Sequence, residues 1–259
     1  MKKLILLFSV GFLFANSALA NNDCFIAQEN GHIIQEEGNC KARHSPCSTF
    51  KIAISLMGYN EGILIDETHP ELPFQQGYTD WQEVWKQNHN PTSWMKNSVV
   101  WYSQIITQKL GKKKFHKYLT KFNYGNRDVS GDKGKDNGLT RSWLSSSLEI
   151  SPHEQIKFLQ KLVDRKLPVS KKAQEMTKNI LFAEEYDGWK FYGKTGAGDI
   201  FSKDGSLDKT HQIGWYVGFI EKENRKIIFA RYIENDGKQD YSSGKKAKSE
   251  AIQKLLELI

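Results

Sequence analysis

The sequence predicts an α/β (α+β) fold with a mostly antiparallel sheet built from both chain ends, flanked by helices, and an inserted all-helical subdomain at about residues 60–180. Three observations predict it: a hairpin pattern near the start, helical patterns in the middle, and three strand patterns followed by one helix at the end. Residues 21–259 are long enough to form a single large domain with an ample core.

A β-hairpin is the first predicted element. Two short runs with strand composition, Phe25 to Gln28 and His32 to Gln35, flank the turn sequence Glu29-Asn30-Gly31. Asn-Gly is favoured in tight hairpin turns because both positions need a positive φ. The residues just outside the two strands should therefore lie close together.

Three cysteines, Cys24, Cys40 and Cys47, all lie in this N-terminal part of the chain. An oxidising compartment permits one disulfide and leaves one free thiol. We expect a Cys24–Cys40 disulfide, because these two residues bracket the hairpin. Cys47 is then either a buried small hydrophobic residue or a second nucleophile beside Ser48.

Two helices are predicted in the middle of the chain. Ser93 to Leu110 has aromatic and aliphatic residues at helical spacing. A second helix runs to about Asp164, because Ser151-Pro152-His153-Glu154 combines an N-cap serine, a proline at the first helical position and a glutamate three residues after the cap. Between them, Asn126 to Thr140 is rich in Gly, Asp and Lys and is predicted to be a surface loop that can form a site wall.

Three strands and one helix are predicted toward the C-terminus. Trp189 to Lys194, Gln212 to Glu221 and Lys226 to Ile233 have strand patterns, and a polar turn joins the last two. Lys245 to Ile259 has apolar residues at helical spacing, so we expect this helix to pack on one face of the sheet.

Residues 1–20 have the pattern of a secretory signal peptide that is cleaved before Asn21. Met1-Lys2-Lys3 is the basic start, Leu4 to Phe14 is the apolar run, and Ala18-Leu19-Ala20 is the cleavage site. The apolar run is too short to span a membrane, and no later segment approaches the required length. We therefore expect a periplasmic or extracellular product; a retained signal anchor is the alternative.

Charge distribution and the spacing of cysteines and histidines argue against nucleic-acid and metal binding. Loss of Lys2 and Lys3 with the leader lowers the formal charge from +7, but the chain stays basic. Its lysines are scattered and no nucleic-acid-binding motif is present, so no nucleic-acid partner is expected. No cysteine or histidine spacing matches a zinc motif, so no metal site is expected. We expect a monomer or a homodimer.

Ser48-Thr49-Phe50-Lys51 is the most informative stretch of the chain. On a helix, residues i and i+3 share one face, so the Ser48 hydroxyl and the Lys51 amine would be neighbours where free backbone N–H groups point outward. A lysine can remove the serine proton only if burial or a nearby charge lowers its pKa. Gly58 is the predicted end of this helix. Alone, the tetrad also fits a capping serine beside an exposed lysine.

Four further motifs follow in order along the chain. Ser98-Val99-Val100 supplies a second hydroxyl at the start of a helical segment, and Tyr124-Gly125-Asn126 opens the predicted loop. Trp143 to Leu148 reads W-L-x-x-S-L. Lys194-Thr195-Gly196 ends a predicted strand, where the lysine offers positive charge and the strand edge can hold a substrate. These elements are not expected to occur in this order by chance.

With these motifs the chain resembles the class D (oxacillinase-type) serine β-lactamases, a class of the penicillin-recognising serine enzymes that share S-x-x-K and K-T-G elements. The resemblance covers essentially the whole mature chain. It implies the serine β-lactamase and penicillin-binding transpeptidase-like fold and hydrolysis of small-molecule β-lactam substrates, penicillins in particular. Y-G-N together with S-x-V separates this class from class A, which uses S-D-N and a glutamate-assisted water.

The resemblance also implies an acyl-enzyme mechanism. Ser48 attacks the β-lactam carbonyl, and the backbone N–H groups of Ser48 and Ala197 form the oxyanion hole. Lys51 carries CO2 as a carbamate (N6-carboxylysine) and acts as the general base, so CO2 or bicarbonate is needed but no other cofactor. Trp143 donates a hydrogen bond to the carbamate, Ser98 relays a proton to the leaving ring nitrogen, and Val100 keeps the pocket dry. The implied substrate-binding residues are Lys194, Thr195, Gly196 and Tyr124.

Two departures from the family pattern affect substrate choice. Position 197 is Ala, where many members have a larger residue, and the arginine that commonly binds the substrate carboxylate is not evident on the last helix. Lys245, Lys246 and Lys248 are the candidates to replace it, and a lysine binds a carboxylate less specifically than an arginine.

Two alternative functions are compatible with the same fold. One is a non-hydrolysing β-lactam sensor domain, which remains acylated and normally follows transmembrane segments. The other is a penicillin-binding transpeptidase or carboxypeptidase, which should lack the sequence context of Trp143.

Overall fold

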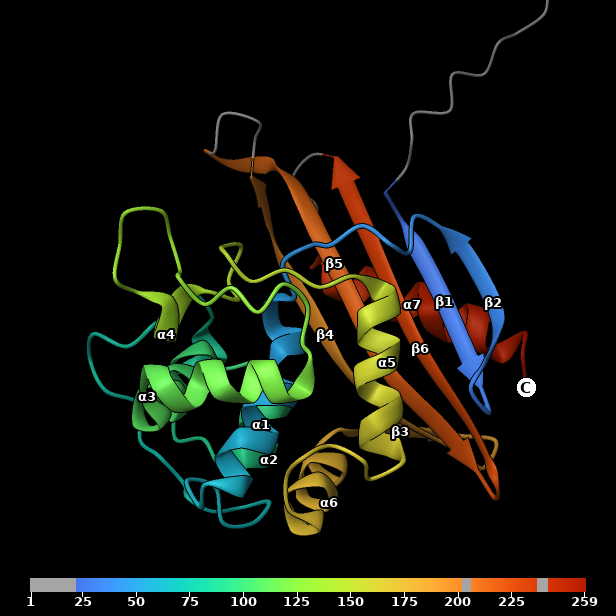
Figure 1. Cartoon of the computed structure of the whole chain (residues 1–259), viewed down its shortest axis with the longest axis horizontal. Coiled ribbons are helices and arrows are strands. Elements are labelled where there is room, and N and C mark those ends of the chain that lie inside the picture. Colours follow the sequence, from blue (N-terminus) through green and yellow to red (C-terminus); the bar gives the residue numbers. More distant parts are fainter. Residues whose placement is uncertain (1–21, 202–205, 237–241) are drawn as a thin grey trace, which may run out of the picture.

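The computed structural model describes residues 22–201, 206–236 and 242–259, so the predicted signal peptide lies outside the described residues. The described part is a six-stranded sheet flanked by helices (Figure 1). The strands are β1 (Cys24–Glu29), β2 (His32–Gly38), β3 (Phe182–Tyr186), β4 (Trp189–Phe201), β5 (Leu207–Lys222) and β6 (Arg225–Asp236). The helices are α1 (Lys51–Asn60), α2 (Pro91–Asn97), α3 (Val100–Phe122), α4 (Gly138–Arg141), α5 (Pro152–Val163), α6 (Lys171–Ile180) and α7 (Ser243–Leu256), with short 3₁₀ helices η1 (Cys47–Phe50) and η2 (Glu83–Trp85).

The sheet is built from both ends of the chain, as the sequence predicted. Its strand order is β2-β1-β6-β5-β4-β3, and all neighbours are antiparallel. The N-terminal strand β1 therefore lies beside the C-terminal strand β6, with Phe25 opposite Arg231. The α/β fold with a mostly antiparallel sheet is confirmed.

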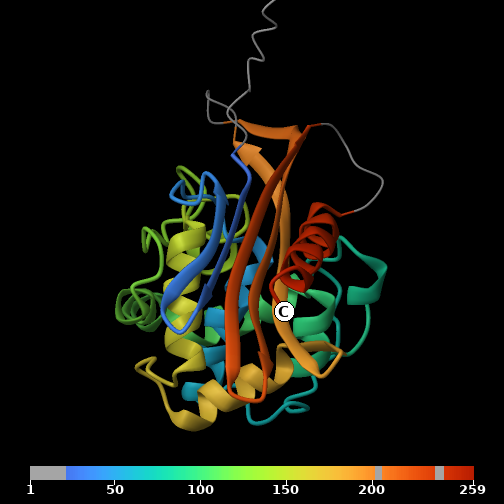
Figure 2. The ribbon, with the colours of Figure 1, turned by 90° about the vertical axis from the view of Figure 1, so that its right-hand side faces the viewer.

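Each face of the sheet buries its own set of apolar side chains, because successive residues of a strand point to opposite faces. On β1, Phe25 and Ala27 belong to the cluster that includes Ala247 and Leu255 of α7. Cys24 and Ile26 belong to the larger cluster under the other helices. Figure 2 shows α5 and α7 on opposite sides of the sheet. The predicted packing of the last helix on the sheet is confirmed.

The predicted N-terminal hairpin and its disulfide are both present. Asn30 and Gly31 form the turn with φ values of 50° and 81°. Cys24 and Cys40 are bonded, with their Cα atoms 5.1 Å apart. Cys47 is a free, buried thiol, and burial raises its pKa to about 11, which disfavours the nucleophilic thiolate.

The predicted continuous helix from Ser93 to Leu110 is wrong. Helix α2 ends at Asn97 and α3 begins at Val100, because Ser98 between them has a left-handed φ of 56°. The Trp85 indole N–H donates to the Asn97 carbonyl at 2.8 Å and occupies a group at the end of α2. Ser98 therefore lies between two helices and not inside one.

The predicted helix end at Gly58 is also wrong. Helix α1 continues to Asn60, and Gly58 is buried inside it. A Cβ at this position would lie 2.9 Å from Leu64 Cγ, so the glycine is explained by close packing and not by a helix stop. Helix α6 and strand β3 were not predicted.

The helices α2 to α6 all fall within the segment predicted as a helical subdomain. The division into residues 21–259 as one domain, with that subdomain at about 60–180, stays a prediction. In the described part of the chain, no helix is both long and apolar enough to cross a lipid bilayer.

Candidate active site

Ser48 and Lys51 are brought together by the junction of η1 and α1. The Lys51 amine donates to the Ser48 hydroxyl oxygen at 3.1 Å. Lys51 is fully buried, at 0% exposure. Burial, and then the positive charge of Lys194, lower the pKa of the Lys51 amine well below its ordinary range. The exposed-lysine interpretation of this tetrad is therefore wrong.

The turn that presents Ser48 is held in an unusual backbone conformation. Cys47 precedes the serine and has a left-handed φ of 48°, which is rare for a residue with a side chain. Both the backbone N–H of Thr49 (3.1 Å) and its hydroxyl (2.7 Å) donate to the Pro46 carbonyl. This local bonding fixes the serine at the start of a buried helix.

Strand β4 passes directly beside this turn. A Cβ at Gly196 would lie 3.0 Å from the Pro46 carbonyl oxygen and 3.1 Å from Thr49 Cγ2, so a larger residue would press on the turn. Behind the strand, a Cβ at Gly244 of α7 would lie only 2.6 Å from the Gly196 carbonyl oxygen. The glycines let Lys194-Thr195-Gly196 lie between the serine turn and the last helix.

Ser98 and Lys194 form a second hydroxyl and amine pair. The Lys194 amine donates to the Ser98 hydroxyl and, at 3.0 Å, to the Thr195 carbonyl. Lys194 is 3% exposed. Burial, and then the charge of Lys248, lower the pKa of Lys194 to about 7. An amine with this pKa can exchange a proton with a neighbouring hydroxyl near neutral pH.

Trp143 lies under the serine turn. Its ring centroid is 5.7 Å from that of Phe50, and the tryptophan is fully buried. Its carbonyl accepts from the Ser45 hydroxyl at 3.0 Å, which ties this segment to the residues before Ser48. Its indole N–H is buried and has no hydrogen-bond partner in the described part of the chain, so one donor is unsatisfied beside this turn.

Three comparisons with known proteins agree with this geometry. The family model for the penicillin binding protein transpeptidase domain matches residues 18–257. "Beta-lactamase OXA-9" of Klebsiella pneumoniae is 40% identical over 268 residues, which cover 98% of this chain and 97% of that protein. "Beta-lactamase OXA-1" of Escherichia coli is 42% identical over 236 residues, which cover 88% and 82%. The crystal structure of the OXA-427 class D β-lactamase is 45% identical, with a TM-score of 0.88, and the match covers 91% of this chain and 98% of that one.

The chain belongs to the class D β-lactamases. The resemblance predicted from the S-x-x-K, S-x-V, Y-G-N and K-T-G motifs is confirmed, and so is the transpeptidase-like fold. In this class D chain, S-x-x-K spans η1 and α1, Ser98 lies between α2 and α3, Y-G-N follows α3, and K-T-G lies in β4.

Three further residues named from the class D pattern lie in different settings. Val100 is 2% exposed at the start of α3. Tyr124 is 1% exposed, its ring lies 5.2 Å from that of Phe50, and its hydroxyl accepts from Gln155 at 3.4 Å. Ala197, by contrast, is exposed on β4. The burial of Tyr124 favours a role in supporting the serine turn over direct contact with a substrate.

The structure also distinguishes the three lysines considered for carboxylate binding in this class D chain. The Lys246 amine donates to Asn235 at 2.7 Å, and Lys245 is exposed near the start of α7. Lys248 lines a pocket of about 420 Å³ together with Lys194 and Thr195. Of these three lysines, Lys248 is the one that lines this pocket with Lys194 and Thr195.

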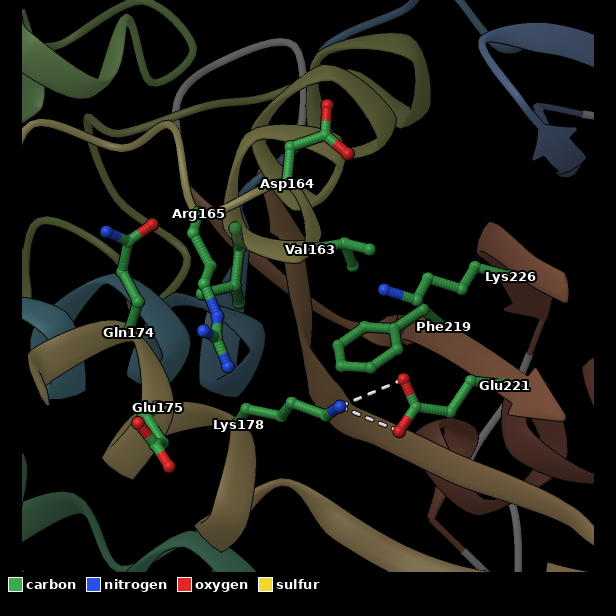
Figure 3. A pocket seen from close by; sticks show the side chains of 10 residues that line it. Val163, Asp164, Arg165, Gln174, Glu175, Lys178, Phe219, Glu221 and Lys226 are labelled. Atoms are coloured by element: carbon green, nitrogen blue, oxygen red, sulfur yellow. Dashed lines mark hydrogen bonds and ion pairs between the residues drawn. The ribbon is translucent and has the colours of Figure 1, made fainter. Parts of the chain in front are cut away.

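Another pocket, of about 350 Å³, lies between α5, α6 and the sheet (Figure 3). Its main contact joins the Lys178 amine to both carboxylate oxygens of Glu221, at 2.7 and 2.9 Å. None of the class D motif residues lines it. Across the described ranges, no group of three or more His, Cys, Asp or Glu is placed to hold a metal ion.

Sequence reasoning missed Gln155, which connects α5 to the serine turn of this class D chain. Gln155 is 1% exposed, and its amide donates to the Thr49 hydroxyl at 3.1 Å and to Tyr124. The only signal was a polar residue at a buried position of α5. That signal does not say which partner the amide finds.

Proposed function

We propose that the chain is a β-lactam hydrolase that cleaves the β-lactam amide of penicillins (oxacillin type) through an acyl-Ser48 intermediate, with CO2-carboxylated Lys51 as general base. One observation carries the proposal: a fully buried lysine amine lies 3.1 Å from the Ser48 hydroxyl. The three relatives described above, at 40–45% identity, are named β-lactamases, which supports hydrolysis over a non-hydrolysing sensor or a transpeptidase.

Ser48 supplies the nucleophile, and its proton leaves toward the Lys51 side chain. The carbonyl oxygen becomes negative as the Ser48 oxygen adds, and the backbone N–H groups of Ser48 and Ala197 stabilise that charge. The close approach of Gly196 to Pro46 and Thr49 supports this pairing, because it places the β4 edge against the serine turn. Preorganised donors of this kind need no rearrangement during the reaction.

The residues around Lys51 fit a carbamate on its amine. A neutral amine is the form that adds CO2, and burial favours the neutral form here. The buried indole N–H of Trp143 has no partner among the residues that the structure describes, and it is suited to donate to a carboxylate-like group beside the Phe50 ring. When bound, the carbamate supplies a base for both acylation and deacylation.

Ser98 and Lys194 act on the leaving side of the substrate. Their hydrogen bond lets Ser98 pass a proton to the departing ring nitrogen, and Lys194 can restore that proton because its pKa is about 7. Lys194, Thr195 and Gly196 hold the substrate carboxylate along the strand edge. Val100 keeps water from the buried amine, and Tyr124 supports the wall of the site.

We propose that residues 1–20 are a signal peptide and that the mature protein is periplasmic. The basic, apolar and small-residue regions of this segment support export. The disulfide between Cys24 and Cys40 supports an oxidising compartment.

The proposal is tested by turnover of a penicillin by the mature protein, with and without added bicarbonate, together with the intact mass of the reacted enzyme. We expect many turnovers, a higher rate with bicarbonate, and little remaining adduct. One stoichiometric adduct that persists would instead identify a sensor or a penicillin-binding protein.

A further inference from the structure

A pocket of about 420 Å³ adjoins the K-T-G motif, and apart from Lys194 and Thr195 its lining residues have no role in the mechanism above. It is lined by α2, the segment from α6 to β3, and strands β4 and β5, with Lys248 of α7. Gly193, Lys194 and Thr195 form its β4 side. Leu181 and Phe182 give it an apolar wall.

The position of this pocket follows from the direction of β4. Gly196 and Gly198 approach the residues of the serine turn, and in the opposite direction along β4 the chain passes through Thr195 to Gly193. The pocket includes Gly193 to Thr195 but neither Ser48 nor Ala197. A substrate held at Ser48 with its carboxylate at Thr195 therefore has the pocket beyond that carboxylate.

Tyr216 lines this pocket and has a buried hydroxyl. The residue is 1% exposed, and its hydroxyl has no hydrogen-bond partner among the described residues. It lies opposite Thr195 in the β4–β5 register, and a Cβ at Gly193 would lie 2.8 Å from its oxygen. Burial raises the pKa of Tyr216, so its hydroxyl stays protonated and can donate to an anion.

Two lysines besides Lys194 line the same pocket. Within the described part of the chain, no hydrogen bond or ion pair reaches Lys96, which is exposed on α2. The Lys248 amine lies 5.8 Å from the Tyr216 ring centroid and pairs with Glu184 at 2.7 Å. The side chains of Lys248 and Glu184 are 33% and 46% exposed, so water screens this pair and an entering anion can displace it.

We propose that Tyr216, Lys248 and Lys96 form an anion subsite that takes a second negatively charged group of the substrate, carried on the ring fused to the β-lactam. The apolar wall at Leu181 and Phe182 receives the carbon atoms that carry this group. The inference rests on the proposed function, because it requires a β-lactam seated at Ser48. It adds a preference for dianionic substrates over substrates with the ring carboxylate alone.

The test compares two cephalosporins that differ only in the substituent on the fused ring, a carboxylate in one and its carboxamide in the other. The readout is kcat/KM for the carboxylate compound divided by kcat/KM for the carboxamide compound. For a compound that is not turned over, the reciprocal of its inhibition constant against penicillin hydrolysis replaces kcat/KM. We expect Tyr216→Phe to lower the ratio about tenfold, because a hydrogen bond to a charged group is lost. Lys96→Gln should lower it about threefold.

Glu184→Gln gives an expectation of the opposite sign. It frees Lys248 from its ion pair, so the ratio should rise about threefold. Lys248 itself is kept, because its charge also lowers the pKa of Lys194. Lys157→Gln, an equal loss of charge at an exposed position of α5, should leave the ratio unchanged.

A ratio that responds to none of the three variants overturns the subsite. Equal losses for both substrates overturn it too, because the pocket would then hold only the ring carboxylate. Penicillin turnover by the unchanged enzyme separates the two proposals: without turnover the proposed function fails, whereas with turnover and an unresponsive ratio only the subsite fails.

Discussion

The Lys51 amine lies 3.1 Å from the Ser48 hydroxyl, yet no solvent reaches the lysine. The two side chains are three residues apart, so one turn of chain sets their separation. The burial of the amine has a wider origin, because Lys51 begins α1 and the apolar residues of α1 pack into the main core of the protein. A local motif therefore depends on the whole core for its chemistry.

Replacing Lys51 tests whether this amine carries the base. Lys51→Ala should leave a folded protein whose penicillin turnover falls about 10²- to 10⁴-fold, the usual contribution of a general base. Circular dichroism tests whether the variant is folded, and steady-state kinetics measure its turnover. Lys157→Ala, on the surface of α5, should keep full turnover. Retained turnover in Lys51→Ala would mean that another group removes the proton.

Replacing Trp143 tests the unsatisfied indole N–H. Trp143→Phe keeps a ring against Phe50 but removes the donor, so about tenfold more bicarbonate should be needed for half-maximal turnover. A bicarbonate titration of the rate measures this shift. Trp81→Phe is the control, because Trp81 is 62% exposed. An unchanged titration in Trp143→Phe would show that the indole does not hold the carbamate.

Substrate binding should depend on pH through Lys194. Its pKa of about 7 is depressed from an ordinary 10.5, so the amine is charged below pH 7 and neutral above it. In saturating bicarbonate, KM for a penicillin should therefore rise as pH increases through about 7. Lys194→Arg stays charged over this range and should lose the inflection. A flat KM between pH 6 and pH 8.5 in the unchanged enzyme would contradict this assignment.

The disulfide should stabilise the N-terminal hairpin without taking part in catalysis. It closes a loop with a sequence separation of 16, so the double change Cys24→Ser with Cys40→Ser should lower the free energy of unfolding by about 3 kcal/mol. Urea denaturation measures the loss, and turnover at 25 °C should persist. A non-reducing peptide map should show the linked pair; free thiols at both positions would rule the bond out.

The elements that the sequence predicted well are those with a strong local signal. The Asn30-Gly31 turn fixed the first hairpin, and the capping box at Ser151 fixed the start of α5. The break at Ser98 was missed because it depends on a distant tryptophan, Trp85, which bonds to the end of α2. Strand β3 was missed because all its residues are exposed, so it has no alternation of buried and exposed positions.

The same distinction applies to the candidate site. Motif spacing named Ser48, Ser98 and Lys194, since each carries its chemistry in its residue type. It did not choose among the lysines of the last helix, because neighbouring positions of a helix point in different directions and only packing shows which one faces β4. Tyr216 was also missed, because a buried tyrosine in a strand is ordinary core until its hydroxyl is seen to lack a partner.

Because β1 pairs with β6, the sheet can close only after the C-terminal part of the chain has been synthesised. Strand β1 (Cys24–Glu29) lies at the very start of the described chain, but one of its two neighbours in the sheet ends at Asp236. Contacts between such distant segments close slowly and only after both have emerged. A nascent chain halted before β6 would hold Ser48 and Lys51 but no closed sheet behind them. Active protein is therefore expected only from chains that have been synthesised beyond β6.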